Sequence, residues 1–141
     1  MIKICFVCTG NTCRSIMAER LMKKVAKEDN IPELKISSRG VYATGENINP
    51  NAKIALKKLH ASSANRKSVK LGKIDKNTLY ITMTEQQKQL INSDKVISFK
   101  SLIGKDIEDP YGQDESVYFD TAKDILNGVN KLIEKLKMWR W

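Results

Sequence analysis

The chain has 141 residues, of which 41% are hydrophobic and 29% are charged, a composition typical of one soluble globular domain over residues 1–141. The same composition excludes an intrinsically disordered chain. The formal net charge of +9 suits an anionic partner, but most basic residues are scattered lysines, without a basic block interleaved with aromatic residues. Nucleic acid is therefore not an expected partner.

The apolar runs and the cysteines indicate a cytoplasmic protein, and a monomer is expected. No apolar run approaches the roughly 18 residues that cross a bilayer, so no membrane partner is expected. Residues 1–7 are too short for a signal peptide. The three cysteines, Cys5, Cys8 and Cys13, are odd in number and crowded together. This pattern argues against the disulfide framework of a secreted domain.

Short apolar runs alternate with segments of helical periodicity along the chain. Strands are predicted at residues 2–8, 34–38, 78–83 and 95–99, and helices at residues 15–28, 49–59, 85–91 and 117–137. Residues 39–50 and 101–115 are predicted as loops, and the apolar stripe of the last helix is expected to run from Phe119 to Leu136. Strands alternating with helices predict an α/β domain whose parallel sheet is covered on both faces.

The stretch CTGNTCRS, residues 8–15, joins the first predicted strand to the first predicted helix. Backbone N–H groups converge at such a turn and the helix N-terminus adds positive charge, so the turn is a typical anion site. Gly10 is expected to supply a positive φ, which Asn11 tolerates next best. Arg14 follows Cys8 by six positions, and its guanidinium fork matches two oxygens of a tetrahedral oxyanion.

Cys8 is predicted to lie at the floor of this site, where the positive surroundings stabilise a thiolate. The arrangement indicates a cysteine-dependent phosphatase: sulfur attacks phosphorus, Arg14 and the loop amides stabilise the transferred group, and water hydrolyses a phosphocysteine. Ser15 is expected to donate its hydroxyl to the sulfur. This chemistry needs no metal and no other cofactor. The predicted phosphate-binding loop comprises, besides Cys8 and Arg14, the residues Thr9, Gly10, Asn11, Thr12, Cys13 and Ser15.

Each of these features also has an ordinary structural explanation. A cysteine at a strand end is usually a small buried hydrophobic residue. Cys5 and Cys8 form a C-x-x-C pair, but residues three apart on a strand face opposite sides, so a redox pair is not expected. His60, the single histidine, is expected on a helix surface. A zinc site therefore lacks ligands.

A phosphatase also needs a general acid for the leaving group, on an exposed segment. The stretch IEDPYG, residues 107–112, offers Asp109 before a proline and beside Tyr111, an aromatic residue that can line a cleft. Asp-Pro alone is a common turn signal. In combination with loop 8–15, we interpret Asp109 as the acid.

VCTGNTCRS near the start and DPYG near the end together resemble the low-molecular-weight protein tyrosine phosphatase family. The resemblance implies that Cys8 is the nucleophile, that Arg14 binds phosphate and that Asp109 is the general acid of a metal-independent hydrolase acting on a phosphorylated protein. It also implies that Cys13 is a redox partner, able to form a reversible disulfide with the nucleophile. The implied fold is a four-stranded parallel sheet of order 2-1-3-4 with helices on both faces.

The chain departs from the family pattern at several places. Ile16 replaces the proline that usually follows CRS, which changes the stiffness of the first helical turn. Residues 63–68, SANRKS, stand where many members carry a histidine-containing segment, so the support of loop 8–15 from that side is left open. The segment after the second strand is shorter than in the family and is expected to place Tyr42, like Tyr111, at the substrate cleft.

Protein phosphoarginine is the favoured substrate, and phosphotyrosine is the alternative. Thr12 stands where most tyrosine-directed members carry an aliphatic residue, and MTEQQKQLI lacks the aspartate that usually follows the methionine. Both features are similar to the bacterial protein-arginine phosphatase branch. A threonine hydroxyl suits a planar guanidinium, and Gly112 after Tyr111 leaves little stacking surface for a phenyl ring. Alternatively, Thr12 only satisfies a loop backbone group.

Two further functions remain as lesser alternatives. Arsenate reductases that share this fold and loop need two more cysteines near the third strand, and the sequence has none there. A basic module that only binds phosphate or nucleic acid would not need the combination of Cys8, Arg14 and Asp109.

Overall fold

The apolar run at the start of the chain forms a central strand of the sheet. In the computed structural model, which describes residues 1–63 and 65–140, the strands are β1 (Ile2–Cys8), β2 (Leu34–Gly40), β3 (Thr78–Thr82) and β4 (Val96–Ser98). They form one four-stranded parallel sheet of order β2-β1-β3-β4, which confirms the predicted topology. Because β1 has a neighbour on each edge and cover on each face, its sequence is almost continuously apolar.

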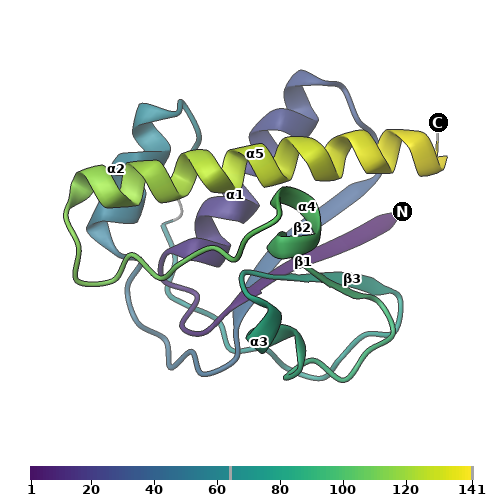
Figure 1. Cartoon of the computed structure of the whole chain (residues 1–141), viewed down its shortest axis with the longest axis horizontal. Helices are drawn as coiled ribbons and strands as arrows, with labels where there is room; N and C mark the ends of the chain where they lie inside the picture. The colour runs from purple at the N-terminus through teal and green to yellow at the C-terminus, as the bar shows by residue number, and fades with distance from the viewer. Residues whose placement is uncertain (64, 141) are drawn as a thin grey trace.

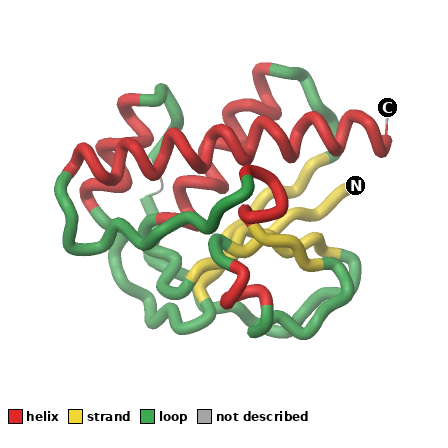
Figure 2. The backbone as a smooth tube through the Cα atoms, viewed as in Figure 1, coloured by secondary structure: helices red, strands yellow, loops and turns green. Residues whose placement is uncertain are grey.

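The helices lie unequally on the two faces of this sheet (Figures 1 and 2). They are α1 (Arg14–Glu28), α2 (Pro50–Lys58), α3 (Glu85–Lys88), α4 (Phe99–Ile103) and α5 (Glu115–Arg140). The long helices α1, α2 and α5 pack against one another on one face, and α4 packs against α5. The short α3 lies at the other face, among loops. Although α5 is 26 residues long, none of the described helices combines the length and the hydropathy of a membrane span.

The main hydrophobic core fills the space between the sheet and the long helices. Phe6 and Ile81 from the strands, Leu21 from α1 and Ile125 from α5 are fully buried there. The periodic apolar residues of the helices therefore face the sheet, as their spacing predicts.

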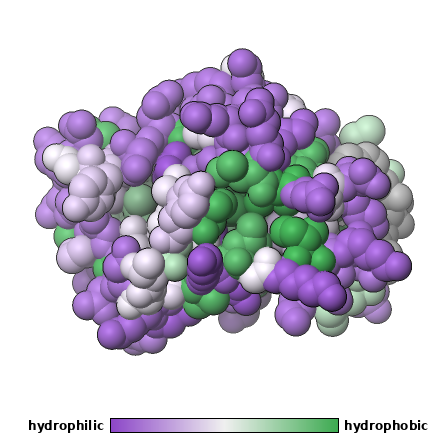
Figure 3. Space-filling view, turned by 90° about the horizontal axis from the view of Figure 1, so that it is seen from below, coloured by the Kyte–Doolittle hydropathy of each residue, from purple (hydrophilic) through white to green (hydrophobic). Residues whose placement is uncertain are grey.

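A smaller cluster covers the opposite face of the sheet. It contains Cys5, Val7, Tyr80 and Ile91, whereas Cys8 belongs to the main core. Cys5 and Cys8 thus lie on opposite sides of β1, as predicted, and do not form a redox pair. Seen from below, the molecule shows a hydrophobic area bordered by hydrophilic residues (Figure 3).

Two segments after β3 differ from the prediction. The helix expected over residues 85–91 ends at Lys88, because the chain then turns and buries Ile91 in the smaller cluster. The helix α4 begins at Phe99, which was expected to end the fourth strand, and runs into the segment expected to be a loop. It buries Phe99 and Leu102 and ends at Gly104, which has a φ of 82°. Five residues are too short to show helical periodicity, so the sequence pattern missed α4.

Two residues near the helices also lie differently from the prediction. The apolar stripe of α5 begins at Tyr118, which is buried, whereas Phe119 is half-buried beneath the ammonium groups of Lys58 and Lys123. His60 is exposed, as expected, but it follows the end of α2 in a left-handed conformation with a φ of 59°.

Candidate active site

Loop 8–15 leaves β1 and enters α1 through a sharp turn. Asn11 carries the left-handed conformation, with a φ of 57°, whereas Gly10 does not have a positive φ, contrary to the prediction. Gly40, at the end of β2, lies against this loop: a Cβ atom there would come within 2.7 Å of the Gly10 carbonyl carbon and 2.8 Å of the Asn11 nitrogen. Glycine therefore lets the sheet edge pack directly against the turn.

The sulfur of Cys8 is buried and receives hydrogen bonds. The Asn11 backbone N–H donates to Cys8 Sγ across 3.2 Å, and Ser15 Oγ lies 2.9 Å from the same sulfur. Asn11 Nδ2 donates to Ser15 Oγ across 2.7 Å. Because that bond uses an acceptor site of the hydroxyl, the Ser15 proton is free to point at the sulfur.

A buried polar network supports the loop from beneath. Asn11 Oδ1 accepts from Arg66 Nη1 across 3.1 Å and from the Val69 N–H across 3.0 Å. Arg66 Nη2 also donates to Ser38 Oγ and Glu19 Oε1, at 2.9 and 3.3 Å. Segment 63–68, whose contribution the sequence left open, thus supports the loop through Arg66.

Arg14 begins α1 and is 4% exposed. Its Nη1 donates to the Ile107 carbonyl oxygen across 3.0 Å, and its Nη2 lies 3.8 Å from Asp109 Oδ2. Its Nε is buried and has no partner among the described residues. One edge of the guanidinium is therefore anchored, while a donor remains for an oxyanion at the mouth of the loop.

Asp109 faces the loop from the segment between α4 and α5. Its Oδ1 accepts from the Tyr111 N–H across 3.1 Å, and Cys13 Sγ lies 3.9 Å from the same oxygen. Burial, with smaller contributions from the neighbouring Cys8 and Asp109, raises the pKa of Cys13 to about 12. Cys13 is therefore a thiol near neutral pH and can donate a weak hydrogen bond to the carboxylate.

The predicted site residues meet in one pocket of about 170 Å³, the Cys8 pocket. Its lining consists of Cys8, Thr9, Gly10, Asn11, Thr12, Cys13, Arg14, Asp109 and Tyr111. Ser15 lies behind the sulfur rather than in the lining. Tyr42 does not line this pocket but lines the adjoining groove.

Thr12 and Tyr111 both line the Cys8 pocket. Thr12 is half-buried, and no hydrogen bond of its hydroxyl is found within residues 1–63 and 65–140. The structure therefore does not support the alternative that this hydroxyl satisfies a loop backbone group. Tyr111 is 74% exposed, and Gly112 follows it with a φ of 81°.

Gln87, which the sequence analysis missed, connects α3 to the loop. Its Nε2 donates to Thr9 Oγ1 across 3.1 Å, while its Oε1 accepts from the backbone N–H groups of Met83 and Thr84. The stretch TEQQ has the spacing of a capping box, and Thr84 and Gln87 form one. That spacing could have identified the helix start, although not the bond to Thr9.

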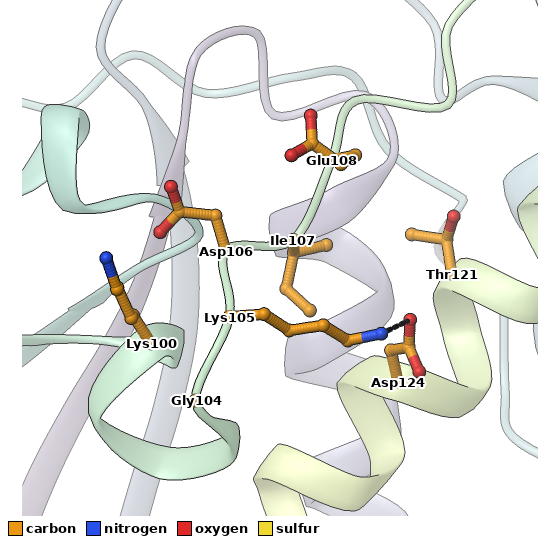
Figure 4. A pocket seen from close by; sticks show the side chains of 8 residues that line it. All are labelled: Lys100, Gly104, Lys105, Asp106, Ile107, Glu108, Thr121 and Asp124. Atoms are coloured by element: carbon orange, nitrogen blue, oxygen red, sulfur yellow. Dashed lines mark ion pairs between the residues drawn. The ribbon is translucent and has the colours of Figure 1, made fainter.

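The segment that carries Asp109 is fixed on the side facing α5 (Figure 4). Lys105 Nζ pairs with Asp124 Oδ2 of α5 across 3.1 Å. The Ile107 N–H donates to the Met83 carbonyl oxygen across 2.9 Å, and Asp106 Oδ1 accepts from the Glu85 N–H across 3.0 Å. These bonds hold the backbone before Asp109 in position against Arg14.

No metal site is seen in the described part of the chain, where no group of three or more His, Cys, Asp or Glu side chains is arranged to hold an ion. Beside the Asp109 carboxylate, the Cys8 pocket is lined by loop 8–15 and Arg14, whose N–H donors suit an anion rather than a cation.

Comparison with known proteins identifies the class of protein. Over residues 3–140 the sequence matches the family described as low molecular weight phosphotyrosine protein phosphatase, and the chain belongs to this family. The protein is a phosphatase, a hydrolase. The predicted resemblance is therefore confirmed.

Curated relatives have two different names. The chain is 34% identical over 146 residues to the protein-arginine-phosphatase of Geobacillus stearothermophilus, with 96% of each chain covered. It is 31% identical over 140 residues to PtpB of Staphylococcus haemolyticus, a low molecular weight protein-tyrosine-phosphatase, with 93% of this chain and 97% of the relative covered.

Solved structures show the same fold. A YwlE mutant from Bacillus subtilis superposes with a TM-score of 0.89 at 33% identity, covering 97% of this chain and 99% of that one. A second structure is described as the YwlE arginine phosphatase in a cysteine-to-serine mutant with a phosphorylated active-site serine. It superposes with a TM-score of 0.88 at 34% identity, covering 99% of this chain and 98% of that one.

Proposed function

We propose that this protein dephosphorylates proteins through a phosphocysteine at Cys8, with phosphoarginine as the favoured substrate. The observation that carries the proposal is the Cys8 pocket, a space of about 170 Å³ lined by Cys8, whose sulfur is held by hydrogen bonds, and by Arg14 and Asp109. The phosphorylated serine in the mutant YwlE structure supports a covalent phosphoryl group at the corresponding place.

In the first step, the Cys8 thiolate attacks phosphorus, so that an S–P bond forms while the P–N bond of phosphoarginine breaks. Asp109 delivers a proton to the departing nitrogen, which leaves as part of a guanidine group. Arg14 and the loop N–H groups hold the phosphoryl oxygens.

In the second step, water attacks the phosphorus of the phosphocysteine. Asp109 takes a proton from this water, the S–P bond breaks, and phosphate leaves. The Ser15 hydroxyl stabilises the thiolate that is regenerated.

The choice of phosphoarginine rests on the rim of the pocket. The Thr12 hydroxyl is without a partner among the described residues, so it is available to the N–H groups of a substrate guanidinium or to the attacking water. An aliphatic residue in its place would instead favour an aromatic ring. The somewhat higher identity to protein-arginine-phosphatase than to PtpB points the same way.

Phosphotyrosine is the second candidate, and one observation favours it. Tyr42 and Tyr111 are both largely exposed, at 64% and 74%, and line the groove and the pocket. Two aromatic residues around a phosphate site can stack on a phenyl ring.

Arsenate reduction has less support. A thiol relay needs further cysteines at the site, and the third cysteine of the chain, Cys5, packs in the cluster on the other side of β1.

The proposal also includes the expectations from the sequence that the protein is a cytoplasmic monomer and that it works without a metal or another cofactor.

Hydrolysis of a small aryl phosphate in the presence of EDTA tests the reaction. The wild-type protein should hydrolyse the aryl phosphate and the Cys8→Ser variant should not, because serine cannot supply the thiolate nucleophile. Dependence on added metal, or equal activity in the Cys8→Ser variant, would contradict the phosphocysteine mechanism.

Competition between a phosphoarginine peptide and a phosphotyrosine peptide tests the substrate. Wild type should prefer phosphoarginine, and Thr12→Ile should shift the preference toward phosphotyrosine. A wild type that prefers phosphotyrosine would make the second candidate correct.

A further inference from the structure

A second hollow, the side groove, opens from the Cys8 pocket. It has a volume of about 490 Å³ and shares Thr9, Arg14 and Asp109 with the pocket. Because Arg14 and Asp109 line both spaces, the leaving group that Asp109 is to protonate lies at their common border. The rest of a protein substrate must continue outward from this border.

Apart from Arg14, Glu108 and Asp109, the side groove is lined by neutral polar and apolar residues. Gln86 and Gln89 are exposed, and their side-chain amides have no hydrogen-bond partner within the described residues. Leu90 is 50% exposed and Tyr42 is 64% exposed. Glu108 adds a carboxylate, and no lysine lines the groove in the described part of the chain, although the net charge is +9.

Helix α3, which carries Gln86 and ends directly before Gln89, is held in place. Thr84 and Gln87 form its capping box, and the Glu85 N–H donates to Asp106 Oδ1 across 3.0 Å. Gln87 is also bonded to Thr9 of the catalytic loop. Gln86 and Gln89 are therefore displayed at a fixed position relative to the Cys8 pocket.

We propose that the side groove binds the extended polypeptide next to the phosphorylated residue. Gln86 and Gln89 hydrogen-bond main-chain groups of the substrate, because a carboxamide offers the donor and the acceptor that a peptide group needs. Leu90 and Tyr42 contact its apolar side chains. Glu108 disfavours acidic neighbours and favours basic ones. This inference rests on the proposed phosphatase function and adds the recognition of sequence around the phosphorylated residue.

The test compares a small aryl phosphate, which fills only the Cys8 pocket, with phosphoarginine peptides that carry either lysine or glutamate beside the phosphorylated residue. Wild type should have a higher kcat/KM for the lysine peptide than for the glutamate peptide. The Glu108→Gln variant should show a smaller difference in kcat/KM between the two peptides. The double variant Gln86→Ala with Gln89→Ala should lose about tenfold more kcat/KM on peptides than on aryl phosphate, the loss expected for one or two hydrogen bonds.

The matched control is Asn127→Ala, which removes an exposed amide from α5, remote from the groove lining. It should leave both activities within about twofold of wild type. Binding of the same peptides to Cys8→Ser gives a second readout that does not need turnover. There the double variant should weaken peptide binding about tenfold without changing the affinity for inorganic phosphate by as much.

Each other outcome overturns a different claim. Equal losses on aryl phosphate and peptides would show that α3 acts only through the loop, and unchanged peptide kinetics would show that the substrate leaves the pocket elsewhere. Either result refutes the side-groove proposal while leaving the phosphatase function intact. Failure of wild type to hydrolyse aryl phosphate would instead refute the phosphatase function itself.

Discussion

Arg66 Nη1 donates to Asn11 Oδ1 across 3.1 Å, and the other end of the same guanidinium lies 3.3 Å from the buried carboxylate of Glu19. The first bond holds the side chain of the residue that carries the left-handed turn of loop 8–15. The second provides a counter-charge for a carboxylate that is 3% exposed. Arg66 therefore links the stability of the network to the geometry around Cys8.

Replacing Arg66 with alanine should lower kcat about 10–100-fold, because it removes a charge-assisted hydrogen bond that positions the loop. KM for an aryl phosphate should change less, since Arg66 does not line the Cys8 pocket. Arg66→Lys should restore only part of the loss, because a single ammonium cannot reproduce the fork. Steady-state kinetics on aryl phosphate measures both parameters.

Arg20→Ala is the matched control for this prediction. Arg20 Nε also pairs with Glu19, across 3.1 Å, but no bond from Arg20 to loop 8–15 is found among the described residues. An equal fall in kcat in this control would show that the charge balance at Glu19, and not the bond to Asn11, sets activity.

Asp109→Asn should slow phosphoenzyme formation in a way that depends on the leaving group. An asparagine cannot deliver a proton, so substrates with poor leaving groups should lose about 10²–10⁴-fold, the typical worth of one acid–base group. An activated aryl phosphate should be much less sensitive. Single-turnover rates for a graded series of aryl phosphates measure the effect, and equal losses along the series would identify another residue as the acid.

Mild peroxide should inactivate the enzyme by oxidising Cys8, and Cys13 should make this inactivation reversible. Peroxide converts the Cys8 thiolate to a sulfenic acid, and the Cys13 thiol then condenses with it, forming an S–S bond and releasing water. A thiol reductant should restore wild type, whereas Cys13→Ser should recover less, because its sulfenic acid is open to further oxidation. Cys5→Ser should behave like wild type, since Cys5 packs on the other side of β1.

Mass spectrometry of the oxidised protein decides whether this protection operates. A disulfide between Cys8 and Cys13 is expected. Reversible inactivation without that bond would mean that another reaction protects the nucleophile.

The free energy of unfolding should decrease at alkaline pH, partly because of Tyr118. Its side chain is 1% exposed, its hydroxyl has no partner within the described residues, and burial raises the pKa of Tyr118 from 10.0 to about 12. The unfolded chain therefore loses this proton before the folded one does. The stabilisation is fully present below pH 10 and is lost as the pH rises from 10 to about 12.

Tyr118→Phe should reduce this alkaline loss by about 1 kcal/mol near pH 11, as measured by urea unfolding at several pH values. Cys13, whose pKa is also raised to about 12, should keep part of the pH dependence. Tyr42→Phe, at an exposed site, is the control and should leave the curve unchanged. Parallel curves for wild type and Tyr118→Phe would exclude Tyr118 as a source.

Local patterns in the sequence were enough to predict the four strands and the residues that line most of the pocket, whereas the strand order was implied by the family resemblance. The apolar run of β1, the turn after it and the Asp-Pro segment each have a short-range signature, and Cys8, Arg14 and Asp109 indeed meet in one pocket. The helix α4 was missed because five residues show no period.

The supports of the loop could not be predicted in the same way. Arg66 is 55 positions from Asn11 in sequence, and nothing local distinguishes it from the other scattered basic residues. The placement of the positive φ at Asn11 rather than Gly10 likewise depends on side-chain bonds from distant segments. Such bonds repay the strain of a left-handed asparagine, and they exist only in the folded chain.

The pairing of Arg14 with Asp109 has a consequence for turnover. Asp109 Oδ2 lies 3.8 Å from Arg14 Nη2, so the arginine meant for phosphate already faces an anion. Any phosphate that enters has to compete with this internal carboxylate. We expect this competition to reduce product inhibition by free phosphate. The same competition should weaken the binding of every simple oxyanion.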